Sequence, residues 1–206
     1  LLLAGRALGH GKISSPPARS ATIGSAFEDA CGSTLYSLET SDPTGNIQQM
    51  LQNIQSGTTL NSSCDLFQCK AYQFADNKAN VQSYTAGQVI PIKIDIVAPH
   101  TGVANVSVVD TASNSILGGE LISFTNYAST STGVAPNNTA FSVTMPDVSD
   151  TCTTAGACVL QWYWFSEEVD QTYEDCIDFT MGSGSSSDSS DAASSAVASA
   201  TESAAA

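Results

Sequence analysis

Apolar and polar side chains alternate over much of the second half of the chain. This period of two residues, carried by β-branched and aromatic side chains between Gly, Pro, Asn and Asp, is typical of strands with one buried face. Several such strands in succession predict an antiparallel β-sandwich. The segments that carry the pattern are Gln88–Val97, Ala104–Val109, Ala140–Met145, Val159–Trp164 and Asp175–Thr180. Within them, Trp162 and Trp164 occupy alternate positions, so they share one face and are expected in the core.

The stretch from Cys31 to Gln82 is long, polar and only briefly periodic. Asn46 to Asn53 is the one part that predicts a short helix, and the remainder is expected to be mostly loop. Long loops on a sandwich are where function usually lies.

The two ends of the chain differ in composition from the part between them. Leu1–Gly9 reads as the remnant of a secretory signal peptide, with an apolar run and then small residues. From Met181 the chain becomes rich in Ser and Ala, and this 181–206 segment is predicted to be a disordered linker or stalk. Residues 10–180 then form a single domain, large enough for a proper core. We expect a secreted protein, tethered to a surface if an anchor follows the stalk.

The net charge of −14 restricts the choice of partners. So acidic a chain repels phosphate backbones and anionic lipids, which argues against nucleic-acid binding and electrostatic membrane docking. A neutral polysaccharide carries no such penalty. No apolar run reaches the roughly 18 residues that a transmembrane helix needs.

Six cysteines form an even set, which in an exported chain favours three disulfides. Sequence alone permits about 15 pairings, although the short spacing of Cys152 and Cys158 indicates a small closed loop. The sequons at Asn61, Asn105 and Asn137 predict N-glycosylation in a eukaryotic secretory pathway.

The chain has only two histidines, His10 and His100. If cleavage falls between Gly9 and His10, the mature chain begins with a residue that carries both an α-amine and an imidazole. Their ordinary pKa values, about 7.7–8.0 and about 6.5, let both release a proton to a metal near neutral pH. One more imidazole, from His100, completes three nitrogens in a tetragonal arrangement, which suits copper.

Three segments carry a resemblance to a known family. HGKISSPPARSATIG, which starts at His10, resembles the opening of lytic polysaccharide monooxygenases, and Ala98–Thr101 resembles the element around their second copper histidine. Gln171–Cys176 resembles the Gln-x-Tyr-x-x-Cys element of fungal cellulose-active members. Longer strings such as CKAYQFADN and CVLQWYWFSEEVDQTYEDC are most similar to auxiliary-activity family sixteen.

The resemblance implies a catalytic domain over residues 10–180, on an immunoglobulin- or fibronectin-like sandwich with long loops and short helices. It implies one copper held by His10 and His100, with Tyr173 as the axial residue and Gln171 hydrogen-bonding beside it. It also implies oxidative cleavage of cellulose or a related β-glucan, mainly at C1, by a monomer. The co-substrate would be dioxygen or hydrogen peroxide. Electrons would come from a small reductant or a cellobiose dehydrogenase-like enzyme.

The same resemblance implies two further disulfides, Cys31–Cys64 and Cys69–Cys176. Three tyrosines of the loop-rich part are candidates to stack on a sugar ring: Tyr36, Tyr72 and Tyr84.

Other interpretations of the same residues lead to different functions. One stretch of the chain carries five acidic residues: Glu167, Glu168, Asp170, Glu174 and Asp175. They could suggest the two catalytic carboxylates of a glycoside hydrolase, but a solvated loop near the copper face explains them better. A non-catalytic copper-binding surface protein of the same fold is the main alternative. A cell-wall structural protein with incidental histidines is the third.

Overall fold

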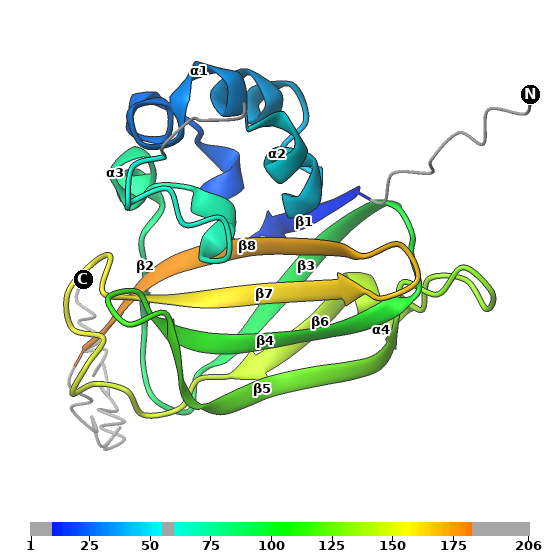
Figure 1. Cartoon of the computed structure of the whole chain (residues 1–206). Coiled ribbons are helices and arrows are strands. Elements are labelled where there is room, and N and C mark those ends of the chain that lie inside the picture. Colours follow the sequence, from blue (N-terminus) through cyan, green and yellow to red (C-terminus); the bar gives the residue numbers. More distant parts are fainter. Residues whose placement is uncertain (1–9, 55–59, 183–206) are drawn as a thin grey trace, which may run out of the picture.

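Two β-sheets pack face to face in the computed structural model, which describes residues 10–54 and 60–182 (Figure 1). A three-stranded sheet has the order β1-β3-β6, and a five-stranded sheet has the order β2-β8-β7-β4-β5. All neighbouring strands are antiparallel except β2 and β8, which are parallel. The predicted sandwich is therefore confirmed. The strands are β1 (His10–Ser15), β2 (Gln82–Tyr84), β3 (Val89–Ala98), β4 (Gly102–Asp110), β5 (Ser115–Tyr127), β6 (Ala140–Thr144), β7 (Cys158–Ser166) and β8 (Gln171–Met181).

The five alternating segments all form strands of the sandwich, as their pattern predicts. In β3 every second residue, Ile90, Ile92 and Ile94, is buried between the sheets while the residues between them are exposed. Trp162 and Trp164 of β7 are fully buried in the same core. The five predicted segments correspond to β3, β4, β6, β7 and β8.

Strand β5 carries no such pattern and was not predicted. It lies at the edge of the five-stranded sheet, and most of its residues are exposed. Gly118 and Gly119 have positive φ values of 79° and 118° in its middle, and its pairing with β4 has three irregularities in register. A bulged, exposed edge strand has no alternation to detect.

A helical layer covers the outer side of β8 (Figure 1). The prediction of mostly loop from Cys31 to Gln82 was therefore partly wrong. The helix at Asn46–Asn53 was expected, but a helix of 17 residues before it was not, because Gly32, at a φ of 84°, interrupts its periodicity. The α-helices are α1 (Ser25–Ser41), α2 (Ile47–Asn53), α3 (Phe74–Asn77) and α4 (Pro136–Thr139), and the 3-10 helices are η1 (Arg19–Ala21), η2 (Cys69–Ala71) and η3 (Lys78–Asn80).

The helical layer has a small apolar core of its own and is cross-linked by disulfide bonds. Phe27, Leu35, Ile47, Met50 and Leu66 are among the buried members of this second apolar cluster. The structure contains Cys31–Cys64 inside this layer, Cys69–Cys176 between η2 and β8, and Cys152–Cys158 in the loop before β7. These are the pairs that the resemblance and the short spacing implied.

Strand β8 is consequently buried on both faces. One face contacts β1 and the sandwich core, and the other contacts η1, η2 and α2. This double burial determines the environment of the predicted site residues that β8 carries.

Candidate metal centre

Strand register brings the two histidines to the same end of the three-stranded sheet. His10, the first residue of β1, pairs with Ala98, the last residue of β3. His100 follows Ala98 by two residues, after Pro99 ends the strand. His100 is buried, with 6% of its surface exposed, and His10 is partly buried.

The turn that carries His100 is anchored to the neighbouring sheet. The Thr101 carbonyl accepts a hydrogen bond from Ser166 Oγ at 2.8 Å, and Thr101 Oγ1 accepts one from the Thr130 backbone N–H at 2.9 Å. Ser166 pairs in turn with Gln171 across β7 and β8. The His100 turn is therefore tied to the strand ends that carry Gln171.

Gln171 and Tyr173 contact each other at the start of β8. The Tyr173 hydroxyl donates to Gln171 Oε1 at 2.6 Å, and the phenol ring is stacked on Trp164 with centroids 4.3 Å apart. Tyr173 is fully buried, and burial raises the pKa of its phenol, which the side chain of Asn46 opposes. Near neutral pH this residue is therefore a neutral phenol.

The loop of residues 42–46, between α1 and α2, also lies at this centre, and sequence reasoning missed it. Asp42 Oδ2 is 2.8 Å from His10 Nε2, and the Gly11 backbone N–H donates to the Thr44 carbonyl at 3.0 Å. Asn46 caps α2 by accepting from the Gln49 backbone N–H at 2.8 Å. The run Asp-Pro-Thr-Gly-Asn is a turn signal, but nothing in it indicates which histidine the turn approaches.

The expectation of a solvated acidic loop was wrong for two of its five residues. Glu174 and Asp175 are 4% and 1% exposed, because β8 is covered on both faces; they are not part of a solvated loop. Burial raises the pKa of Glu174 to about 8, and Asp175 accepts from Ser20 Oγ. The other three acidic residues, Glu167, Glu168 and Asp170, are exposed in the turn from β7 to β8.

Of the tyrosines considered for sugar stacking, Tyr72 and Tyr84 are buried at 2% and 5% exposure. They cannot present a ring to a polymer, because they pack in the helical layer and the sandwich core. Tyr36 is half-buried. Among the sequons, Asn61 and Asn137 are exposed and Asn105 is half-buried in β4, and their glycosylation stays a prediction.

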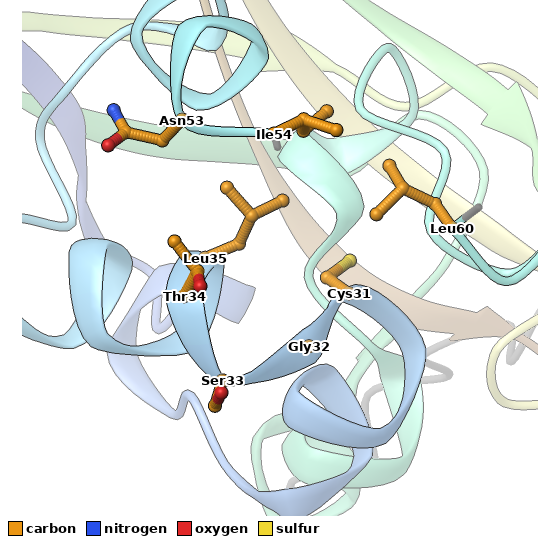
Figure 2. A pocket seen from close by; sticks show the side chains of 8 residues that line it. All are labelled: Cys31, Gly32, Ser33, Thr34, Leu35, Asn53, Ile54 and Leu60. Carbon is orange, nitrogen blue, oxygen red and sulfur yellow. The ribbon is translucent and has the colours of Figure 1, made fainter. Parts of the chain in front are cut away.

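One surface pocket lies away from these residues. It is formed between the kink of α1 and the end of α2, and its lining includes Gly32, Leu35 and Ile54 (Figure 2). It contains none of the predicted site residues.

Comparison with known proteins assigns the chain. A family model for cellulose-degrading lytic polysaccharide mono-oxygenases matches residues 10–179. The chain belongs to this family of mono-oxygenases. As a lytic polysaccharide mono-oxygenase, it is expected to use copper and to act oxidatively on a polysaccharide. No match was found among curated proteins.

Several solved structures resemble this mono-oxygenase. A chitin binding domain from Burkholderia pseudomallei is 13% identical, with a TM-score of 0.46, and the match covers 84% of this chain and 100% of that one. An AA10 lytic polysaccharide monooxygenase from Streptomyces lividans is 16% identical, with a TM-score of 0.44 and coverage of 83% and 99%. An AA15 enzyme from Thermobia domestica is 17% identical, with a TM-score of 0.40 and coverage of 84% and 99%.

The residues at this end of the mono-oxygenase fit a copper ion chemically. Within residues 10–54 and 60–182, no group of three or more His, Cys, Asp or Glu side chains could hold a metal. A copper site with two histidines does not require such a group if its third ligand is the α-amine that cleavage before His10 would create. Only Nδ1 of an imidazole can close a six-membered chelate ring that includes the metal and the amine of the same residue. In His10 the other ring nitrogen, Nε2, contacts the Asp42 carboxylate, so Nδ1 is the nitrogen that faces away from Asp42.

Two of the earlier expectations concern the ends of the chain. The signal remnant Leu1–Gly9 lies outside the described residues, and so do residues 183–206 of the predicted 181–206 stalk. The expected start of the stalk at Met181 was wrong, because Met181 is the last residue of β8 and is buried. No helix in the described part of the chain is long and apolar enough to cross a membrane.

Proposed function

We propose that the mature protein is a secreted, copper-dependent lytic polysaccharide mono-oxygenase that cleaves the β-1,4-glucan of cellulose, oxidising it at C1. The sequence motifs favour auxiliary-activity family sixteen within the larger family. The observation that carries the proposal is the pairing of His10 with Ala98, which brings His10 and His100 to one end of the sandwich. That the family match begins at residue 10 supports cleavage between Gly9 and His10.

The copper would be held by the α-amine and imidazole of His10 and by the imidazole of His100. Tyr173, as a neutral phenol, would lie beside the copper as a weak donor and would limit access to it. Gln171 keeps the phenol oriented through its hydrogen bond. When bound, copper supplies the one-electron and oxygen chemistry that oxidation of a C–H bond requires, with electrons from an external reductant and oxygen from dioxygen or hydrogen peroxide.

The surroundings suit an uncharged polymer. The chain carries a net charge of −14, which disfavours anionic substrates and is indifferent to a neutral glucan. His10 and Asp42 have 16% and 35% of their side chains exposed, so the site opens at a strand end instead of a deep cleft. We propose that the protein acts there as a monomer, with a small reductant or a cellobiose dehydrogenase-like enzyme as electron donor.

The test is to produce the chain with His10 as its first residue, load it with copper and incubate it with cellulose and ascorbate. The expected products are oligosaccharides with an aldonic acid at the reducing end, identified by mass spectrometry. His100→Ala should abolish them. A matched control that adds one Gly before His10 moves the amine away while keeping both imidazoles, and it should lose both tight copper binding and product.

Two results would contradict the proposal in different ways. Release of unoxidised sugars alone, or equal product from His100→Ala, would exclude the copper chemistry at this site. Tight copper binding without oxidised product from any glucan would favour the non-catalytic copper-binding protein.

A further inference from the structure

The loop of residues 42–46 is in contact with the residue proposed as the first copper ligand. Resting on the proposed function, we propose that Asp42 is a positioning residue: its carboxylate orients the His10 imidazole through Nε2 and strengthens Nδ1 as a metal donor. Neither the family resemblance nor the histidine motifs point to this residue.

The carboxylate of Asp42 is itself held in place. Its Oδ1 accepts hydrogen bonds from the Thr44 backbone N–H at 3.1 Å and from Thr44 Oγ1 at 2.6 Å. Its Oδ2 is thereby directed to His10 Nε2 at 2.8 Å.

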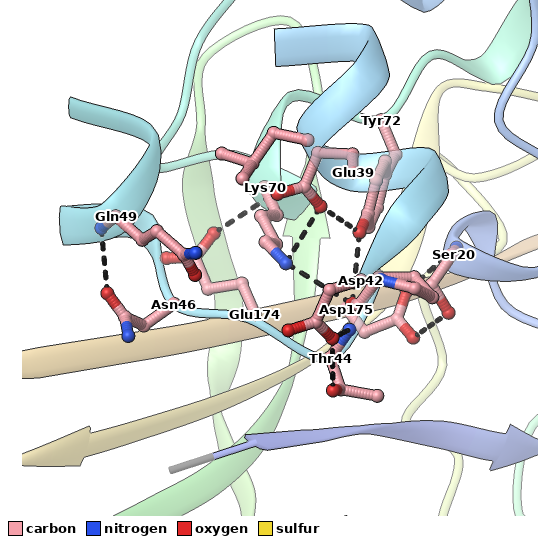
Figure 3. A network of polar contacts seen from close by, with 12 residues as sticks. Ser20, Glu39, Asp42, Thr44, Asn46, Gln49, Lys70, Tyr72, Glu174 and Asp175 are labelled. Carbon is pink, nitrogen blue, oxygen red and sulfur yellow. Dashed lines mark hydrogen bonds and ion pairs between the residues drawn. The ribbon is translucent and has the colours of Figure 1, made fainter. Parts of the chain in front are cut away.

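The loop is fixed to β1 on one side and to a buried charged cluster on the other (Figure 3). Beside Asp42, the Gly11 N–H donates to the Thr44 carbonyl at 3.0 Å. The Pro43 carbonyl accepts from Lys70 Nζ at 3.2 Å, and Lys70 Nζ lies 2.8 Å from Glu39 Oε2.

The members of this cluster have almost no freedom to move. Lys70 and Glu39 are each 1% exposed, and Tyr72, which donates to Glu39, is 2% exposed. A buried ion pair resists rearrangement, since separating the two charges leaves each unpaired in the interior. The position of Asp42 is therefore set by the packed interior of the helical layer.

The chemical consequence follows from the two nitrogens of the ring. A carboxylate at Nε2 favours the tautomer with the proton on Nε2, so the lone pair lies on Nδ1, the nitrogen that can chelate together with the α-amine. The negative charge also makes the ring a stronger donor, which favours Cu(II) over Cu(I). Loss of such a partner typically reduces metal affinity by about 10–100-fold.

The experiment compares Asp42→Asn with the unmodified mature chain. Asparagine keeps the size of the side chain and an oxygen for Thr44, but it removes the charge at His10. Cu(II) affinity is measured on the copper-free protein by competition with a chelator, and the Cu(II) electron paramagnetic resonance spectrum is recorded after loading. We expect an affinity about 10–100-fold weaker, a changed copper hyperfine splitting and a higher reduction potential.

Asp147→Asn is the matched control. Asp147 accepts from the Ser149 backbone N–H at 3.2 Å and from Ser149 Oγ at 2.6 Å, the same local pattern that Asp42 makes with Thr44. It is exposed in the loop that follows β6. Asp147→Asn should leave copper affinity and spectrum unchanged.

The outcomes separate this inference from the proposed function. If the unmodified chain binds copper tightly and Asp42→Asn matches it in affinity and spectrum, the role of Asp42 is overturned while the proposed function stands. If the unmodified chain binds copper no better than a histidine peptide, both are overturned. An equal loss in Asp147→Asn also overturns the role of Asp42, because the effect would then be general.

Discussion

At the scale of single residues, the approach of two strands at Gly102 determines how His100 is presented. A Cβ at Gly102 would lie 2.1 Å from the Phe165 carbonyl oxygen and 2.9 Å from Trp164 Nε1. Both atoms belong to a packed strand, so they cannot give way without moving β7. We expect Gly102→Ala to lower the free energy of unfolding by at least about 1–3 kcal/mol, the usual cost of overpacking, and to weaken copper binding through the displaced His100 turn.

Chemical denaturation of the copper-free protein measures the effect of Gly102→Ala. Gly182→Ala is the control, since nothing lies within 4 Å of a Cβ there, and it should change the free energy of unfolding by less than about 0.5 kcal/mol. A stability of Gly102→Ala equal to that of the control would show that the strands can separate at this point without cost.

A site residue could be predicted from the sequence when its residue type alone indicates its chemistry, and not when its role depends on packing. His10 and His100 could be proposed as ligands from residue type, motif and an assumed cleavage, and the fold brings them to one end. Asp42 could not, because an aspartate before proline is an ordinary turn residue until the packing of α1 against η2 directs it to His10. The burial of Glu174 was likewise hidden, since only the unpredicted helical layer covers it.

At the scale of elements, the strands of the core were predictable because burial on one face imposes alternation, whereas β5 and α1 were not. Strand β5 is an exposed edge with a glycine bulge, and α1 is broken by Gly32. The connection between the helical layer and the sandwich is therefore best tested through the disulfide that joins them. Cys69–Cys176 joins η2 to β8 across 107 residues, while Cys152–Cys158 closes only six.

Chain entropy predicts a different cost for removing each of these two bonds. A loop of about 100 residues gives about 4.7 kcal/mol, and the same relation gives about 2 kcal/mol for six residues. Replacing Cys69 and Cys176 by Ala should therefore reduce the free energy of unfolding about twice as much as replacing Cys152 and Cys158. Urea denaturation of the two double variants gives the comparison, and similar losses would indicate that η2 is held to β8 by packing alone.

At the scale of the whole molecule, the site is assembled from four parts of the chain, namely the start of β1, the 42–46 loop, the His100 turn after β3 and the start of β8. One buried contact joins η1 and α3 to the second half of β8. Arg19, in η1 after β1, donates from Nε to Asp178 Oδ2 at 2.9 Å and from Nη2 to Oδ1 at 2.7 Å. Asn77 of the helical layer donates to the same carboxylate at 2.8 Å, and the Arg19 and Asp178 side chains are 6% and 0% exposed.

Removing Arg19 alone would leave the Asp178 charge buried without its partner, which typically costs about 3–5 kcal/mol. Arg19→Met should therefore reduce the free energy of unfolding by about that amount. Adding Asp178→Asn to it should restore part of the loss, because the amide needs no counter-charge and its oxygen still accepts from Asn77. A double-mutant cycle in urea measures the coupling between the two positions. Simple additivity of the two changes would mean that the Arg19–Asp178 pair does not hold η1 to β8.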